Sequence, residues 1–231
     1  AAWLKSNTAK DGLLSVAGLD IRVVFYAERE DLLNAADLPA GHYAVLYDKE
    51  TEPCYKKGVF ICNGKNTFVQ IRPEPNLLSG DFTLSGWLYC QGQTEKNDDK
   101  WGTAFGCAEW SGKAVKGIAV RRTSRGFLEV VFGDGTVCRN VSVINDITTA
   151  NSLKWYFISV VHKSGEFEFF VNGKLVSRIK GVYAVSRADF RIGHSNKLNA
   201  GESFWYGMVK DIKIYAKKLD ESEILELYYQ G

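Results

Sequence analysis

The chain has 231 residues, 45% of them apolar and 13% aromatic, which suffices for one large β domain or two smaller domains. No stretch approaches the roughly 18 consecutive apolar residues of a membrane-spanning helix, so we expect no membrane insertion. The 29 basic and 27 acidic side chains are interspersed and give a net charge of +2, which argues against a nucleic-acid partner. The one local basic cluster, Arg121-Arg122 with Arg125, is interpreted as a solvated hairpin edge.

The N-terminal third predicts two small units. Residues 1–19 contain the small, polar run AKDGLLSVAG and are expected to form an arm that orders only against a neighbour. Residues 20–72 contain β-branched and aromatic runs such as IRVVFY, which predict a small β-hairpin domain. Within it, Asp37-Leu38-Pro39, Tyr43 to Tyr47 and Val59 to Gly64 resemble the small hairpin units of tailed-phage fibre and adhesion proteins. That resemblance implies a role in a viral particle.

Five cysteines, at positions 54, 62, 90, 107 and 138, are an odd number without CxxC spacing. This pattern argues against zinc and against a complete disulfide framework. Cys54 and Cys62 flank a predicted hairpin and could pair, but buried thiols are the favoured interpretation. The cysteine content fits assembly in a reducing compartment.

The segment RPEPN at 72–76 predicts a domain boundary, because two closely spaced prolines are incompatible with a central strand. Residues 73–231 contain strand-like runs at intervals of about 8–12 residues, which predicts an all-β, antiparallel sandwich of two sheets. In the run 81–90, alternation places Phe82, Leu84, Gly86, Leu88 and Cys90 on one face and Trp87 and Tyr89 on the other. Asn172-Gly173 is the strongest hairpin signal.

The segment 204–229 predicts a strand, a turn and a closing helix. The spacing of Val209, Ile212 and Ile214 slips by one near Lys210-Asp211, as a β-bulge causes. Asp220 with Glu223 fits a capping box. The helix is expected to have an apolar stripe of Ile224, Leu225, Leu227 and Tyr228.

Five motifs in order resemble the concanavalin A-like lectin/glucanase superfamily, in its laminin-G-like branch, over residues 76–231. They are Asp81-Phe82-Thr83 with Trp87, Trp155-Tyr156, Phe169 to Gly173, Ile192-Gly193, and Gly207 to Tyr215 followed by Leu219, Glu223 and Ile224. The resemblance implies a jelly-roll sandwich whose concave face or rim loops often bind carbohydrate. The fold also hosts hydrolases and structural modules, so it leaves function open.

Hydrolysis in this superfamily requires alternating carboxylates on one strand, and the nearest run is Glu166-Phe167-Glu168. A solvent-facing pair before a turn is the favoured interpretation. GxSxG, HExxH and P-loop motifs are absent, and His42, His162 and His194 are isolated. We therefore predict a non-enzymatic protein.

A sugar site needs an exposed aromatic ring with polar groups nearby. The predicted glycan-binding candidates are Trp101, Trp110, His194, Asn196 and Trp205, whereas Trp87 and Trp155 match core positions of the family. The resemblance implies no cofactor other than calcium, for which the candidate ligands are Asp98, Asp99, Asn199 and Glu202. Plain solvated loops are the favoured interpretation of those four residues.

Together these features predict a recognition or adhesion module of a viral particle, such as a tail fibre or decoration protein that binds host-surface carbohydrate. The alternatives are a structural virion protein that uses the sandwich for subunit contacts, a bacterial cell-surface or secreted glycan-binding module, and a degenerate glycoside hydrolase. The expected partners are a host-surface glycan, other virion proteins and further copies of the chain, with a trimer expected for a fibre tip.

Overall fold

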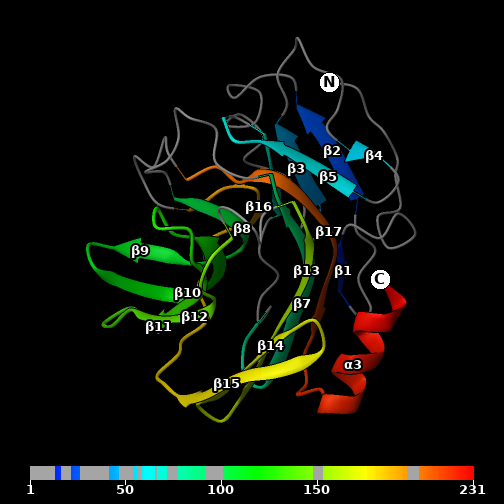
Figure 1. The fold of residues 1–231 in the computed structure, drawn as a ribbon. Helices are drawn as coiled ribbons and strands as arrows, with labels where there is room; N and C mark the ends of the chain where they lie inside the picture. The colour runs from blue at the N-terminus through cyan, green and yellow to red at the C-terminus, as the bar shows by residue number, and fades with distance from the viewer. Residues whose placement is uncertain are drawn as a thin grey trace.

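Two β-sheets stacked face to face make up the body of the protein in this computed structural model (Figure 1). The structure describes residues 59–65, 67–71, 78–91, 101–147, 153–196 and 203–231, together with the backbone of four short strands before residue 57.

The first sheet has eight strands within the described residues. Its main path is β15 (Lys174–Lys180), β14 (Glu166–Val171), β13 (Trp155–Lys163), β7 (Phe82–Cys90), β17 (Tyr206–Tyr215), β5 (Val59–Asn63) and β4 (Tyr55–Lys56). These neighbours are antiparallel, whereas β1 (Leu14–Val16) runs parallel to the second half of β17.

The second sheet has nine strands in the described part of the chain. Its path is β12 (Arg139–Ile144), β11 (Leu128–Asp134), β10 (Ala114–Arg122), β8 (Gly102–Gly106), β16 (Phe190–Ile192), β6 (Phe68–Ile71), β3 (His42–Leu46) and β2 (Arg22–Tyr26). β9 (Glu109–Ser111) pairs with β10, and only β2 and β3 run parallel among these pairs. The predicted antiparallel sandwich is confirmed.

Alternation along β7 places its side chains in two cores. Phe82, Leu84, Leu88 and Cys90 lie between the sheets in the main core. Trp87 points the other way and packs beneath α3 (Glu221–Gln230), which covers part of the outer face of the eight-stranded sheet (Figure 1). The alternation read from the sequence is confirmed.

The closing segment also agrees with its sequence pattern. Asp220 Oδ1 accepts a hydrogen bond from the Glu223 N–H at 2.9 Å, and Glu223 Oε2 accepts one from the Asp220 N–H at 2.8 Å, which completes the capping box. Ile224 and Leu227 are buried, whereas Leu225 remains 38% exposed at the edge of the predicted stripe. No helix among the described residues is long and apolar enough to cross a bilayer.

Two local backbone predictions are confirmed as well. The pairing of β17 with β7 shifts between Lys210 and Lys213, and the bulged Asp211 has a positive φ of 52°. Asn172 and Gly173 both have positive φ values, as a tight hairpin turn between β14 and β15 requires.

Residues 59–71 differ from the predicted separate hairpin domain. β5 pairs with β17 in one sheet, and β6 pairs with β16 in the other, so the expected boundary at 72/73 divides one sandwich. Phe60 and Val69 are fully buried in the main core, because the sandwich covers apolar surface that a lone hairpin of this size would leave in water. The predicted arm contributes β1, of which only the backbone is described, and all side chains of residues 1–58 lie outside the described part of the structure.

Candidate functional site

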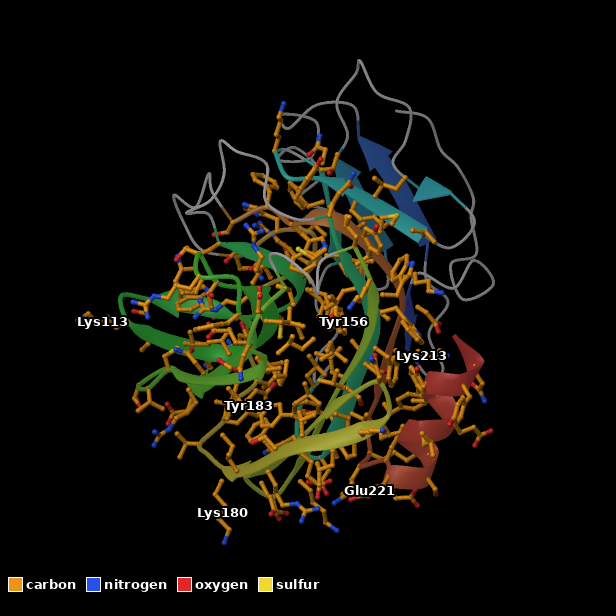
Figure 2. All side chains as sticks on the ribbon, viewed as in Figure 1. Lys113, Tyr156, Lys180, Tyr183, Lys213 and Glu221 are labelled. Atoms are coloured by element: carbon orange, nitrogen blue, oxygen red, sulfur yellow. The ribbon has the colours of Figure 1, made fainter. Side chains whose placement is uncertain are left out.

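The outer face of the nine-stranded sheet carries two of the predicted glycan-binding residues. Ile118 and Val120 of β10 point into the main core, so the alternate residues Ala119 and Arg121 point outward. Figure 2 shows Lys113, at the tip of the β9–β10 hairpin, on the side of the molecule opposite Glu221 at the start of α3. This face is therefore remote from the helix.

Trp101 and Trp110 enclose Arg121 on this face. The Arg121 Cζ lies 4.4 Å from the ring centre of Trp101 and 4.7 Å from that of Trp110. Both indoles reach it because Trp101 directly precedes β8 and Trp110 lies in β9, and both strands pair with β10. Trp101 is 40% exposed even with this contact, whereas Trp110 is half-buried.

Glu129 balances the charge of Arg121. The two residues face each other on β10 and β11, with 2.6 Å between Arg121 Nη2 and Glu129 Oε1. Arg121 Nη2 also lies 3.4 Å from Oδ1 of the exposed Asn140. The ion pair neutralises the guanidinium, so the Trp101–Arg121–Trp110 cluster together with Glu129 has no net charge.

The sequence analysis did not identify Arg121 as a residue of the candidate site and interpreted it as part of a solvated hairpin edge. The side chain of Arg121 is only 11% exposed and Arg122 is 6% exposed, whereas Arg125 is exposed, so that interpretation is wrong for two of the three arginines. The signal was Glu129, which a short hairpin places opposite Arg121.

Trp110 also has a packing role. With Cys138 it packs against a small outer core of Ala108, Val115, Ala119 and Val131. Cys138 Sγ donates a hydrogen bond to Asn140 Oδ1 at 3.2 Å, and partial burial raises the pKa of its thiol. Cys138 is thus held as a neutral packing group beside the cluster.

His194 and Asn196 lie further along the same sheet. The His194 ring centre is 4.0 Å from that of Phe204, and Phe204 forms a bridge with Thr103, two residues beyond Trp101. Asn196 Nδ2 donates a 2.6 Å hydrogen bond to the Asp189 carbonyl. Asn196 therefore has a structural bond within its own segment, and His194 belongs to an aromatic contact rather than to the Arg121 cluster.

Trp205 lies in the main core and is 1% exposed. Its Nε1 donates a hydrogen bond to the Tyr89 carbonyl at 3.2 Å. The prediction that Trp205 is an exposed ligand contact is therefore wrong, because its indole packs in the main core between the two sheets. Trp87, 9% exposed, has the predicted structural position.

The calcium candidates Asp98, Asp99, Asn199 and Glu202 lie outside the described residues, as do the side chains of His42 and Cys54. Across the residues that are described, no group of three or more His, Cys, Asp and Glu side chains is arranged to hold a metal ion. Calcium stays a prediction.

Glu166 and Glu168 on β14 form ion pairs with cationic neighbours. Glu168 Oε1 accepts a hydrogen bond from Arg178 Nε at 2.9 Å, and Glu168 Oε2 lies 3.0 Å from Lys218 Nζ. Burial alone would raise the pKa of Glu168, but the hydrogen bonds from Lys218 and Arg178 outweigh burial and lower this pKa below its usual value. A general acid needs a raised pKa, so this geometry favours a structural role.

Comparison with solved structures shows the same fold in larger proteins. The receptor binding domain of botulinum neurotoxin D is 16% identical, with a TM-score of 0.59 over 81% of this chain and 48% of that chain. The botulinum neurotoxin serotype G binding domain is 15% identical, with a TM-score of 0.58 over 76% and 43%. The chain spans less than half of each, and identities this low show the fold alone.

A search of curated proteins found no significant match. A family model described as the concanavalin A-like lectin/glucanases superfamily (Laminin_G_3) matches residues 63–225. This match covers well over half of the sequence and begins at the end of β5, in agreement with the sandwich. The chain therefore belongs to the concanavalin A-like lectin/glucanases superfamily.

Proposed function

We propose that this chain is a non-enzymatic carbohydrate-recognition module that binds glycan on the outer face of the nine-stranded sheet, at Trp101. The observation that carries the proposal is that Arg121 covers one face of the Trp101 ring while the side chain remains 40% exposed. The C–H face of a pyranose packs well on an exposed indole.

The contacts of Trp101 favour binding in a second way. A ring already held by a guanidinium loses little freedom when a ligand stacks on it, which lowers the entropic cost of binding. Asn140 and Ser142 on β12 are exposed on the same face and offer hydrogen-bonding groups for sugar hydroxyls. Because Glu129 neutralises Arg121, the surface suits a neutral hexose better than an acidic sugar.

The test is a glycan array with the full chain, followed by titration calorimetry with the best neutral oligosaccharide. Trp101→Ala is expected to weaken binding at least tenfold, whereas Tyr229→Ala, which removes a 76% exposed ring from α3, is expected to leave it unchanged. Absence of neutral-glycan binding at millimolar concentration, or wild-type affinity in Trp101→Ala, overturns the proposal.

We further propose that the module serves a viral particle as a fibre or decoration protein and that its ligand is a host-surface glycan. The support is the resemblance of residues 35–71 to fibre hairpins and the free thiols of Cys90, Cys107 and Cys138, which need no oxidising compartment. Mass spectrometry of purified phage particles should detect the chain, and native mass spectrometry should show a trimer. Recovery from bacterial envelopes alone supports the cell-surface alternative instead.

A further inference from the structure

A second aromatic group lies on the outer face of the nine-stranded sheet, on the side of β8 away from β10. We call Phe68, His194 and Phe204 the Phe204 cluster. The ring centres of His194 and Phe204 are 4.0 Å apart, and that of Phe68 lies 5.4 Å from His194 and 6.3 Å from Phe204. Phe68 is buried, whereas His194 and Phe204 are half-buried, so part of their surface remains exposed to solvent.

Strand alternation places this cluster outside the sandwich. Val69 of β6 and Ile192 of β16 point into the main core. The residues beside them, Phe68 and Arg191, therefore point to the outer face, and the Arg191 Cζ lies 5.3 Å from the Phe68 ring centre. The Phe204 cluster thus shares the face that carries Trp101.

Arg191 fixes the His194 ring in position. Its Nη1 donates hydrogen bonds to His194 Nδ1 at 3.2 Å and to the Ser195 carbonyl at 2.9 Å, and its Nε donates one to Gln70 Oε1 at 3.1 Å. A guanidinium can only donate, so His194 Nδ1 is the acceptor, which sets the orientation of the imidazole. Rings that are already held lose little freedom when a ligand packs on them, and this lowers the entropic cost of binding.

The pairing of the strands brings the Phe204 cluster next to Trp101. Arg121 of β10 pairs with Thr103 of β8, and Thr103 forms a bridge with Phe204 on its other side. Trp101 precedes Thr103 by two residues, so Trp101 and Phe204 are diagonal neighbours on this face, roughly 7–8 Å apart. A single pyranose stacked on Trp101 leaves Phe204 uncovered, whereas the next sugar of an oligosaccharide reaches it.

We propose that the Phe204 cluster is a second sugar subsite, and that the ligand of this face is a neutral oligosaccharide of two or more residues. One pyranose stacks on Trp101, and the next contacts the exposed parts of Phe204 and His194. This inference rests on the function proposed for Trp101 and adds the length of the ligand and the residues that contact its second sugar.

NMR titration of the ¹⁵N-labelled full chain with the mono-, di- and tetrasaccharides of the glucose, mannose and galactose series tests the proposal. In the series that binds, the affinity should rise at least tenfold from the monosaccharide to the tetrasaccharide. Phe204→Ala and His194→Ala should each reduce this gain and leave the affinity for the monosaccharide within twofold, whereas Trp101→Ala should weaken binding of every member. The matched control is Tyr229→Ala on α3, which should keep the full gain.

The outcomes separate the subsite from the function on which it rests. Equal affinity for the monosaccharide and the tetrasaccharide, or a gain that survives in both Phe204→Ala and His194→Ala, overturns the second subsite and leaves the Trp101 site in place. If Phe204→Ala also weakens binding of the monosaccharide, His194→Ala decides, because a retained gain overturns the subsite and a reduced gain supports it. Absence of any neutral-glycan binding to the wild type overturns both.

Discussion

Arg121 and Glu129 form a nearly buried ion pair on the outer face of the nine-stranded sheet, with 2.6 Å between Nη2 and Oε1 and side-chain exposures of 11% and 7%. Their strands hold the two residues directly opposite each other, so the two charged groups meet without either side chain bending along its strand. The pair allows a guanidinium to lie between Trp101 and Trp110 without an uncompensated charge. The stability of the proposed sugar surface therefore depends on Glu129.

Replacing Glu129 with Gln should leave the guanidinium of Arg121 buried without a counter-charge. We expect the free energy of unfolding to fall by about 3 kcal/mol, as is usual when one partner of a buried pair is removed. Urea unfolding followed by tryptophan fluorescence measures this loss. The double variant Arg121→Met with Glu129→Gln should be less destabilised than Glu129→Gln alone, and equal losses would contradict the role of the pair.

The two tryptophans predicted alike should behave differently when truncated. Trp205→Ala removes a 1% exposed side chain from the main core and should cost about 4 kcal/mol of unfolding free energy. Trp101→Ala removes a 40% exposed ring and its contact with Arg121, and should cost about 1 kcal/mol. Thermal or urea unfolding of both variants is the measurement, and similar losses would show that Trp101 belongs to the core.

Local patterns were enough to predict the turns, the bulge at Asp211, the cap at Asp220 and the alternation of β7, because each depends on residues close together in the sequence. The placement of β5 and β6 was not predictable in this way, since their partners β17 and β16 lie more than a hundred residues away. The direction of Trp205 was equally hidden, because it precedes β17 and no alternation within that strand fixes it.

The arrangement of the candidate site around Arg121 also depends on strand pairing that local sequence patterns do not predict. Trp101 and Trp110 were identified as candidates from their residue type, but their convergence on Arg121 requires β8 and β9 to flank β10 in register. The two-sided contact is therefore a product of the sheet order. His194 and Asn196 were chosen for the same chemistry, yet the chain places them beside Phe204 and the Asp189 carbonyl instead.

Gly207, in the family motif that opens β17, should tolerate no side chain. A Cβ there would lie 1.9 Å from the Tyr89 carbonyl oxygen, and its φ of 146° disfavours other residues. We expect Gly207→Ala to cost about 3 kcal/mol, from overpacking and backbone strain together. Gly112→Ala is the matched control, because Gly112 also has a positive φ but has open space around it, so that only about 1 kcal/mol should be lost in urea unfolding.

The ion pairs of Glu168 should make stability depend on pH at the acidic end. Its pKa in the folded protein lies below the unfolded value of about 4.3, so the stabilisation is complete above that pH and is lost as the pH falls through the folded pKa. Arg178 is 48% exposed and Lys218 is 35% exposed, which screens both contacts and limits their sum to about 1 kcal/mol. Urea unfolding of the wild type and of Glu168→Gln should differ by this amount at pH 7 and converge as the pH falls below the lowered folded-state pKa of Glu168. A difference that stays constant from pH 7 to pH 3 would mean that Glu168 acts through packing and not through its charge.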